Sequence, residues 1–479
     1  MELQGYSVLS ESEISRIHDA SVQLLERMGT AILSREALAV ISEAGVEVDS
    51  DTQRVRFPRA LIEDALAATP SSFTVYYRDE EKALEIGGRN LYFASGMDAN
   101  YVWEPATKTR RSATKQDLVD FARLADVLPN IHIVAPMAIP HDVPGRSALV
   151  HAFEAVASNT TKPIYITPGD GPVSRAVLDM AQVVSGETEL CEHPFLIGYA
   201  APTSPLTWQP DAAEAIIEIV RRGIPCALGP CPLMGMTGPM TPAGAVALGN
   251  AEQLSGIVIA YLIRRGTPII YGVMPIATDM RLGFPVHGDP NTALARLAGA
   301  QMAQFYSLPG IVSGPNSDSH CLDEQNAWEK MLTIAVSVNS GVNIMVNAGA
   351  FATVSSVSFE QLVLDDEMSG LWQQMKRGIE VSEETLALDL IETVGVGGNF
   401  LAQMHTLKHW RSDYWIPEIT NRKPYSSWRD EGQQSVVNRA AERAQKLLAE
   451  HQPRPLSPET SATLAQLRER FDAEYAAEG

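Results

Sequence analysis

One pattern recurs along most of the chain and constrains its fold more than any other feature. A short apolar run, rich in β-branched or aromatic residues, ends in Gly, Pro or Asn and is followed by a stretch with helical periodicity. The runs do not alternate polar and apolar residues, which is typical of strands buried on both faces of a parallel sheet. Eight such runs start about 30 to 43 residues apart, at residues 91–96, 131–140, 163–169, 194–202, 224–232, 267–275, 308–316 and 343–351.

Helical patterns separate these runs. A strand followed by a helix, eight times over, predicts an α/β fold of the (β/α)8 TIM barrel type. A doubly wound parallel sheet is the alternative, but the G-x-G-x-x-G fingerprint expected after its first strand does not occur there. The helical stretches are residues 114–127, 173–184, 210–222, 243–265, 292–306, 322–339 and 359–377.

Further segments flank the predicted barrel. Residues 10–29 begin with Ser, end on Gly and carry apolar residues on one face, which predicts an amphipathic helix. A second helix over residues 35–44 and a short strand pair within residues 46–57 are expected to follow. The last helix of the chain is polar enough to form an arm. The expected divisions are an N-terminal α/β cap over residues 1–90, the barrel over residues 91–375 and a helical C-terminal extension over residues 376–479.

Charge and cysteine content exclude several classes of protein. The chain has 37 Lys and Arg against 58 Asp and Glu, a net charge of −21, so nucleic acid is not an expected partner. Four cysteines in 479 residues favour a reducing cytoplasm over a disulfide framework. Prolines or amides interrupt the two longest uncharged stretches, which favours buried core over membrane spans. The N-terminal stretch carries no export signal, and we expect a cytoplasmic protein without a membrane partner.

Functional groups of a (β/α)8 barrel lie just past the carboxyl ends of its strands. Here the residues that follow the runs are rich in Met, aromatic and amide groups and poor in Lys and Arg, which argues against a phosphate-bearing substrate. They suit an apolar or cationic ligand, because an aromatic face attracts a quaternary ammonium by roughly 0.5–2 kcal/mol. Each aromatic residue equally suits a core-filling role. The candidate walls are Tyr101, Trp103, Tyr271, Phe351 and Trp372.

Metal and nucleophile chemistry find little support. Cys226, Cys231 and the adjacent pair His320 and Cys321 offer zinc-type ligands, but H-E-x-x-H, H-x-H and C-x-x-C spacings do not occur. Adjacent side chains diverge on most backbones, and no third group orients a Cys-His nucleophile. We therefore expect no bound metal and assign no catalytic residue.

Two further polar clusters favour structural interpretations. The acidic residues 365–367 are expected to form a solvated helix face. His405 and His409, four residues apart, share one helix face without matching carboxylates. They are interpreted as structural or lid residues.

Several long segments jointly resemble the trimethylamine methyltransferase family. The similarity extends over nearly the whole chain and is far more specific than any short motif. It includes GPCPLMGMTGPMTPAGAVALGN at the start of its longest segment and HTLKHWRSDYW near its end. The segments are residues 54–66, 229–272, 277–290, 358–381 and 398–419.

The resemblance also indicates a branch of the family. Founding members carry pyrrolysine, whereas all 479 positions here are standard residues. The chain is therefore similar to the branch without pyrrolysine, typified by glycine betaine:corrinoid methyltransferase. The position equivalent to pyrrolysine is expected in the loop near residues 316–321.

This resemblance implies a reaction and its partners. A methyl group passes from a quaternary amine, with glycine betaine the favoured substrate, to the Co(I) of a corrinoid (cobalamin) carried by a separate protein, in one-carbon metabolism. Co(I) is itself a strong nucleophile and the amine leaves uncharged, so neither a general base nor a general acid is required. The implied partners are a cognate corrinoid protein and, from the C-terminal arm, a second copy of the chain in a homo-oligomer.

A betaine requires one subsite for its ammonium and another for its carboxylate. The alternatives are another betaine as substrate (proline betaine, carnitine or γ-butyrobetaine), a barrel that binds or senses quaternary amines without catalysis, and a metal-dependent barrel lyase or hydrolase. The candidate binding residues are Asp98, Tyr101, Trp103, Tyr271 and Phe351 for the ammonium, Arg281, Asn316 and His320 for the carboxylate, and Asn347 in the same ring of loops.

Overall fold

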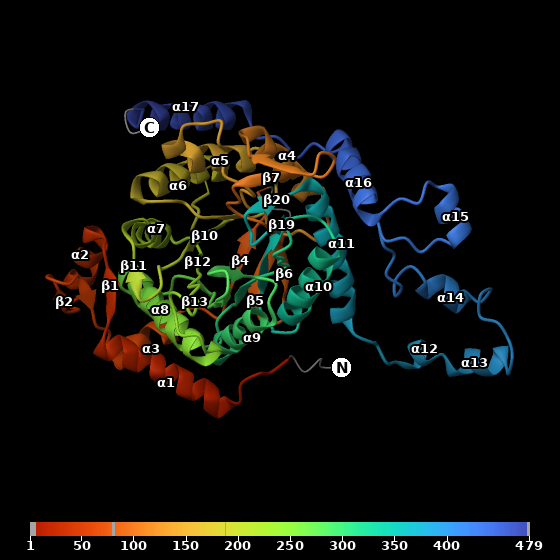
Figure 1. Ribbon diagram of the computed structural model, residues 1–479, viewed down its shortest axis with the longest axis horizontal. Coiled ribbons are helices and arrows are strands. Elements are labelled where there is room, and N and C mark those ends of the chain that lie inside the picture. Colours follow the sequence, from red (N-terminus) through yellow and green to blue (C-terminus); the bar gives the residue numbers. More distant parts are fainter. Residues whose placement is uncertain (1–5, 79–81, 187, 477–479) are drawn as a thin grey trace.

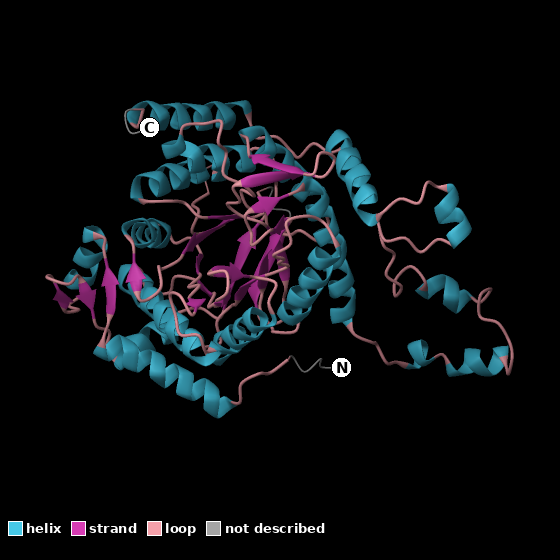
Figure 2. Ribbon diagram, in the orientation of Figure 1, coloured by secondary structure: helices cyan, strands magenta, loops and turns pink. Residues whose placement is uncertain are grey.

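Parallel strands form the interior of the molecule, and helices surround them (Figure 1, Figure 2). The computed structural model describes residues 6–78, 82–186 and 188–476. The N-terminal stretch, for which we expect no export signal, lies partly outside the described residues. Seven of the eight apolar runs contain a strand, and the chain has the predicted α/β fold. One parallel ladder has the order β14, β12, β10, β9 and another the order β17, β18, β6. These strands are β6 (Tyr92–Ser95), β9 (Ile164–Ile166), β10 (Leu196–Ala200), β12 (Cys226–Leu228), β14 (Ile269–Tyr271), β17 (Ile311–Ser313) and β18 (Ile344–Ala348).

Single-residue parallel bridges link the two ladders. Tyr271, at the end of β14, pairs with Gly310 just before β17. On the other side, β6 pairs with Ile133 and β9 pairs with Val134. The run at residues 131–140 thus lies between β6 and β9 but forms isolated bridges in place of the predicted strand.

A helix follows each of these strand segments along the chain (Figure 1). All seven predicted helices are confirmed, and several begin at the polar residue that caps them. Thr114 forms a capping box with Asp117, and Asp170, Asp323 and Ser358 each accept a hydrogen bond from a backbone N–H of the first turn. The sequence pattern did not predict α5, because its residues are apolar on nearly every side. The helices are α4 (Lys115–Val127), α5 (Ala148–Ala157), α6 (Gly171–Ser185), α7 (Pro210–Arg221), α8 (Pro242–Ile263), α9 (Pro290–Phe305), α10 (Glu324–Val338) and α11 (Phe359–Arg377).

A hairpin covers the amino ends of the parallel strands. It consists of β4 (Ser72–Tyr76) and β5 (Ala83–Gly87). The backbone N–H of Tyr76 donates to the carbonyl of Pro194, just before β10, over 2.8 Å. Val75 and Ile86 of the hairpin belong to the same apolar cluster as the interior side chains of the strands. Access for a ligand is therefore left to the carboxyl ends.

Short strands in the loops surround those carboxyl ends. The loop after β6 forms a sheet with the loop after β18, in the order β19, β20, β7, β8. The loops after β12 and β14 form a second sheet, in the order β13, β15, β16. The strands are β7 (Tyr101–Glu104), β8 (Thr109–Ser112), β13 (Leu233–Met234), β15 (Ile276–Asp279), β16 (Phe284–Val286), β19 (Ala350–Phe351) and β20 (Ser356–Val357), and the short helix η1 (Gly145–Ser147) precedes α5.

The N-terminal segment packs on the outer helices. The Ser21 hydroxyl of α1 donates to the carbonyl of Ala247 in α8 over 2.8 Å. Strand β1 pairs in parallel with β11, where Trp208 is buried and donates to Ser255. The predicted amphipathic helix, second helix and strand pair are confirmed, and α3 continues this segment. The elements are α1 (Glu11–Arg27), β1 (Thr30–Ile32), α2 (Arg35–Glu43), β2 (Val48–Asp49), β3 (Arg54–Val55), α3 (Arg59–Ala68) and β11 (Thr207–Trp208).

The C-terminal region is helical, as predicted, but its projecting part differs from the prediction. The last helix, α17, packs on α5 and α6 and is tied to α5 by Arg468 on Glu154 and by Asp472 on His151. The prediction that it forms an arm is wrong, because Leu464 and Phe471 make an apolar stripe that is buried. Residues 378–434 project instead, between α11 and α16 (Figure 1), and we call them the arm. The helices are α12 (Glu383–Leu386), α13 (Leu388–Val394), α14 (Met404–His409), α15 (Tyr425–Asp430), α16 (Val436–Glu450) and α17 (Pro458–Glu474).

Among the described residues, α8 alone has the length and apolar composition of a membrane span. Most of that helix is buried, and it packs against α1, α7 and α9. This burial is typical of a core helix. It agrees with the interpretation of this uncharged part of the sequence as buried core.

Candidate active site

Asp98 follows β6 at the carboxyl ends of the strands. Its φ of 59° is a left-handed conformation that Asp tolerates better than most residues, and its backbone N–H donates to the carbonyl of Pro136. A hydrogen bond from Thr167, which follows β9, stabilises the carboxylate, but burial outweighs it and raises the pKa of Asp98 to about 6. Asp98 is thus a half-buried carboxyl group without a cationic partner among the described residues.

Two tyrosines and a thiol lie beside Asp98. The Tyr199 hydroxyl, from β10, donates to the carbonyl of Gly229 over 3.1 Å, and the Cys231 thiol donates to the same oxygen. The ring of Tyr165 meets that of Tyr199 edge to face, with centroids 5.6 Å apart. Burial raises the pKa of Cys231 to about 11 and that of Tyr199 well above its usual value, with repulsion from Asp98 adding to the shift for Tyr199. All three groups are therefore neutral near pH 7.

Across the same site lies a buried cation, Arg296 of α9. Its Nη1 donates to the carbonyl of Ser313 at the end of β17 over 3.0 Å, and its Nη2 donates to His287 Nδ1 over 3.0 Å. Burial lowers the pKa of Arg296 to about 10, so the group remains charged at pH 7. Burial and the neighbouring guanidinium lower the pKa of His287 well below its usual value, so its imidazole is neutral and accepts.

Within the described residues, no carboxylate lies within 4 Å of Arg296, and its buried Nε has no hydrogen-bond partner. The nearest acidic group that acts on it is Asp318. Both Asp318 oxygens already accept backbone N–H groups, from His287 and Gly288, each over 2.8 Å. A buried guanidinium with an unused donor is suited to bind an anion.

Two of the predicted residues adjoin Arg296. Asn316 Nδ2 donates to the carbonyl of Ser313 over 2.9 Å, which is the oxygen that also accepts from Arg296. Asn347 Nδ2 donates to the Ser313 hydroxyl over 2.6 Å, from a backbone with φ of 86°. Asn316 and Asn347, predicted independently from two loops, are therefore brought together at the end of β17.

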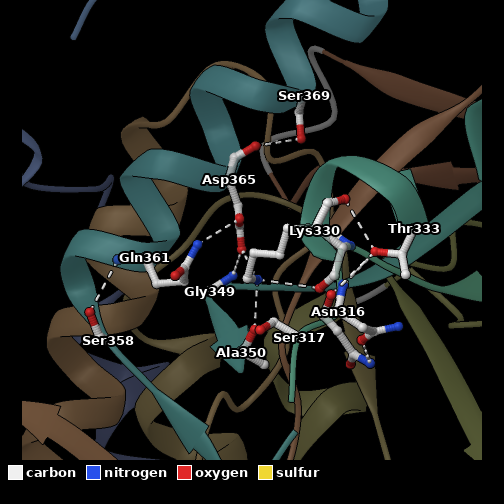
Figure 3. Close-up of polar contacts among 12 residues, drawn as sticks. Asn316, Ser317, Lys330, Thr333, Gly349, Ala350, Ser358, Gln361, Asp365 and Ser369 are labelled. Carbon is white, nitrogen blue, oxygen red and sulfur yellow. Dashed lines mark hydrogen bonds and ion pairs between the residues drawn. The ribbon is translucent and has the colours of Figure 1, made fainter. Parts of the chain in front are cut away.

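A buried ion pair holds the loops that follow β17 and β18, beside these amides (Figure 3). Lys330 of α10 and Asp365 of α11 are both 0% exposed, with Nζ and Oδ2 2.8 Å apart. Lys330 also donates to the carbonyls of Pro315 and Ala350. Asp365 accepts from the backbone N–H of Gly349 over 2.6 Å and from the side-chain amide of Gln361 over 2.9 Å.

The geometry of this pair favours its ionised form. Burial raises the pKa of Asp365 and lowers that of Lys330. However, each ammonium hydrogen faces an oxygen, and every group that faces the carboxylate is a donor. The pair thus fixes the loops after β17 and β18 at one distance from each other.

The acidic residues 365–367 therefore do not form the solvated face that the sequence predicted. Asp365 is used in the ion pair, and Asp366 is buried and accepts from the backbone N–H of Asn130 over 2.8 Å. Burial raises the pKa of Asp366 to about 6. Helical periodicity alone did not reveal these two partners, because both lie far away in the sequence.

Three predicted aromatic residues lie together in the sheet that includes β7 and β19. The rings of Trp103 and Phe351 meet edge to face, with centroids 6.3 Å apart. The guanidinium of Arg110 lies 4.4 Å from the ring centroid of Tyr101. The Tyr101 face is thus already in contact with a cation of the chain itself.

The remaining predicted residues lie apart from Asp98 and Arg296. Tyr271 is buried among the outer helices, where its hydroxyl donates to Asn250 over 2.8 Å. Arg281 is 87% exposed and pairs with Asp279. His320 is exposed, and Trp372 packs in α11 against a separate apolar cluster.

Sequence reasoning missed the residues that give the site its charge and shape. Arg296 is the single basic residue of a helix that is otherwise small, apolar or uncharged, and that isolation was an available signal. Tyr165, Tyr199 and His287 carried none, because strand and loop residues of these types occur throughout the chain. Among the described residues, no group of three His, Cys, Asp or Glu side chains is arranged to hold a metal ion, and all four cysteines are free.

The whole chain matches known proteins. A sequence model of a family described as trimethylamine methyltransferase (MTTB) matches residues 1–475. A trimethylamine methyltransferase, MttB, of Desulfitobacterium hafniense strain DSM 10664 / DCB-2 is 32% identical over 98% of this chain and 95% of its own. A glycine betaine methyltransferase of Desulfitobacterium hafniense strain Y51 is 32% identical over 96% of each chain.

A solved structure is also similar. The crystal structure of the Methanosarcina barkeri monomethylamine methyltransferase (MtmB) aligns with a TM-score of 0.49 and 12% identity, covering 91% of this chain and 97% of that chain.

Removal of one partner of the buried pair is expected to destabilise the protein strongly. Asp365→Asn leaves the Lys330 ammonium buried without its counter-charge, which costs about 3–5 kcal/mol in the free energy of unfolding. The measurement is urea unfolding of the purified protein. The double variant Lys330→Met/Asp365→Asn removes the orphaned charge and is expected to recover part of this loss.

An exposed ion pair provides the matched control. Lys423 and Glu431 are both more than half exposed, so Glu431→Gln is expected to cost less than about 1 kcal/mol. Equal losses for Asp365→Asn and Glu431→Gln would show that burial does not give the Lys330 pair its importance.

Proposed function

Because the chain belongs to the trimethylamine methyltransferase family, we propose that it transfers a methyl group from glycine betaine to the Co(I) of a corrinoid protein. The reaction releases dimethylglycine. The protein is a methyltransferase by its family, and the substrate and acceptor are the proposed part. We also propose a cytoplasmic location, which the four free cysteines support.

One observation carries the choice of a betaine. The site holds two groups of opposite charge, the half-buried Asp98 and the buried Arg296, and neither has an ion-pair partner among the described residues. The neutral side chains of Tyr199 and Cys231 connect the two groups, since Tyr199 is close to Asp98 and to Cys231, and Cys231 is close to Arg296. A zwitterion with a quaternary ammonium at one end and a carboxylate at the other matches both charges.

Each end of the substrate has a distinct set of residues. Asp98 and the ring of Tyr199 attract the ammonium, by charge and by cation–π attraction. Arg296 donates to the carboxylate, and the amides of Asn316 and Asn347 add polar groups beside it. The neutral thiol of Cys231 makes it a wall of the site and not a nucleophile.

The chemistry needs positioning more than proton transfer. The C–N bond breaks, its electron pair stays on nitrogen, and a bond between the methyl carbon and cobalt forms. The corrinoid supplies a strong nucleophile, so the chain needs neither a general base nor a general acid. Its residues orient the N-methyl group and exclude water. The nitrogen loses its positive charge in the reaction. An Asp98 that is only partly ionised near pH 6 therefore holds the charged substrate less firmly than a permanent carboxylate does. Weaker binding of the substrate lowers the barrier between the bound substrate and the transition state.

An apolar rim supports the approach of a carrier protein at this end. The loops after β12 and β14 expose five large apolar side chains, and two of them, Met240 and Met280, have their sulfurs over the same open side of Gly235, where a Cβ would meet both. Exposed apolar patches on a soluble protein mark contact sites. The residues are Met236, Met240, Met280, Leu282 and Phe284.

We further propose that the parallel strands close into the predicted (β/α)8 barrel. The single-residue bridges support closure, because they join β14 to the segment of β17 and join β6 to β9 through residues 131–135. One interior apolar cluster also takes a side chain from each of the eight segments. These side chains are Ala94, Ile133, Tyr165, Ile197, Ala227, Ile270, Ile311 and Ile344. The division into a cap, a barrel and a C-terminal region stays a prediction.

Methyl transfer can be followed directly. We expect the protein, mixed with Co(I) cobalamin and glycine betaine, to convert the Co(I) absorption spectrum to that of methyl–Co(III) and to release one dimethylglycine per methyl group transferred. Proline betaine, carnitine, γ-butyrobetaine and trimethylamine complete the panel of donors. Calorimetric binding of betaine without any spectral change or dimethylglycine would favour a binding or sensing protein.

The carboxylate subsite is tested by Arg296→Gln. Loss of a charge-assisted contact worth about 1.5–3 kcal/mol weakens betaine binding about 10- to 100-fold. Binding of tetramethylammonium, which has no carboxylate, should not change, and this also shows that the variant is folded. Arg281→Gln is the matched control because Arg281 is 87% exposed. A similar loss for both ligands would remove Arg296 from the carboxylate subsite.

The ammonium subsite predicts a pH dependence. The pKa of Asp98 is about 6, so its charge and the affinity for tetramethylammonium rise together between pH 5 and pH 7. Since folding raises the pKa of Asp98 from 3.8 to about 6, ionisation of Asp98 also lowers stability as the pH rises from about 4 to about 6. Asp98→Asn should abolish the pH dependence of binding, weaken binding at pH 7 and melt at a higher temperature than the wild type at pH 7. An unchanged pH profile in this variant would assign the titration to another group.

A further inference from the structure

His287 directly follows β16, the strand whose Phe284 belongs to the apolar rim. Its backbone N–H and that of Gly288 donate to the two oxygens of Asp318, each over 2.8 Å. These bonds hold the start of the loop after β16 against the loop after β17. His287 is partly exposed, whereas Arg296, which contacts its ring, is 3% exposed. A ligand that enters from solvent therefore reaches the imidazole more easily than the guanidinium.

The contact with Arg296 fixes which ring nitrogen of His287 carries the proton. Arginine has no acceptor, so in the 3.0 Å contact Nη2 of Arg296 donates and Nδ1 of His287 accepts. Burial and the neighbouring guanidinium lower the pKa of His287 well below its usual value, so the ring is neutral at pH 7. A neutral imidazole has one N–H. With Nδ1 accepting, that hydrogen is on Nε2.

This Nε2–H is a donor without an acceptor among the residues that the structure describes. The carboxylate of Asp318, which holds the backbone of His287, is already used. It accepts two backbone N–H groups and the hydroxyl of Thr353, the last over 3.1 Å. With Nδ1 occupied and Nε2 protonated, the ring can only donate. The group that a ligand presents to His287 must therefore be an acceptor.

The guanidinium of Arg296 also makes this N–H a stronger donor. Hydrogen bonds in series polarise one another, so a cation that donates to Nδ1 increases the positive charge on the hydrogen at Nε2. In the described part of the chain, no carboxylate within 4 Å offsets the charge of Arg296. Charge-assisted hydrogen bonds are stronger than neutral ones. The acceptor that suits His287 best is therefore an anion.

We propose that His287 determines specificity in the carboxylate subsite, where its Nε2–H binds a carboxylate oxygen of the substrate and Arg296 sets its tautomer. This inference rests on the proposed betaine substrate and adds a second donor to the site. A carboxylate accepts at both of its oxygens, so it can use more than one donor. A quaternary amine with a hydroxyl group in place of the carboxylate presents only a neutral acceptor and is expected to bind more weakly.

Two substitutions separate the roles of the two ring nitrogens. An Asn side chain places an oxygen near the position of Nδ1 and can still accept from Arg296, but it has no donor that reaches the position of Nε2. A Gln side chain can place its amide N–H there. His287→Asn should weaken the binding of glycine betaine, measured by calorimetry, about tenfold or more, because a hydrogen bond to a charged group is lost. His287→Gln should recover most of this affinity.

Tetramethylammonium shows whether the loss is confined to the carboxylate subsite. It has no carboxylate, so both variants should bind it as the wild type does, which also shows that they are folded. His141→Asn is the matched control because His141 is exposed. This variant should keep the wild-type affinity for both ligands.

The tautomer can be measured without any substrate. In ¹⁵N NMR of the full-length protein with labelled histidine, the signal that is absent from His287→Asn belongs to His287. The wild type at pH 7 should show a neutral ring with its proton on Nε2. Arg296→Met removes the donor to Nδ1, so both neutral tautomers should then be populated.

Three results contradict the inference. They are a wild-type affinity for betaine in His287→Asn, equal losses for betaine and tetramethylammonium in that variant, and a proton on Nδ1 in the wild type. Failure of the proposed function looks different. Preferential binding of betaine that depends on His287, without methyl transfer, would support this inference and remove the proposed reaction. Equal wild-type affinity for betaine and tetramethylammonium would overturn the betaine substrate together with this inference.

Discussion

The ion pair between Lys330 and Asp365 is the interaction on which the polar end of the molecule depends. Two buried charges are costly unless every donor and acceptor is used, and here the ammonium faces three oxygens and the carboxylate faces three donors. The acceptors and donors belong to the loops after β17 and β18, so the cost of desolvation is offset by fixing both loops in place. Asn316 lies in the loop after β17 and Asn347 near the end of β18, and they share Ser313 as an acceptor beside Arg296. The position of the carboxylate subsite therefore follows from a contact that touches no ligand.

The site itself is characterised by charges that the chain does not neutralise internally. A protein pairs buried charges wherever stability alone decides, because an unpaired one is unfavourable. Asp98 responds to burial with a raised pKa, whereas Arg296 cannot lose its proton near pH 7 and stays charged. The unused donor of Arg296 and the partly ionised Asp98 are thus complementary to a ligand that carries both signs. The neutral phenols and thiol between them add shape without adding charge.

The sequence predicted most of the fold and a smaller part of the site. Apolar runs and helical periodicity are local signals, so seven strands and seven outer helices could be located from neighbouring residues. Helix α5 was missed because a helix buried on all sides loses its polar stripe. Position at the carboxyl end of a strand identified Asp98, Asn316 and Asn347, since the carboxyl ends of parallel strands all lie at the same end of the molecule. This position did not distinguish the three residues from Tyr271, although side chains alternate along β14 and that of Tyr271 points outward to the helices. Strand position also could not find Arg296, which reaches the site from a helix.

The same topology separates the candidate active site from the arm. A strand delivers its last residues to one end of the molecule, and the helix that follows returns the chain to the other end. The loops after the strands hold the charged site and its apolar rim, whereas the segment after α11 leaves from the face closed by the hairpin of β4 and β5. An insertion at that point can grow long and apolar without obstructing ligand entry. The exposed apolar surface of the arm and the apolar rim at the site are thus separated by the thickness of the fold.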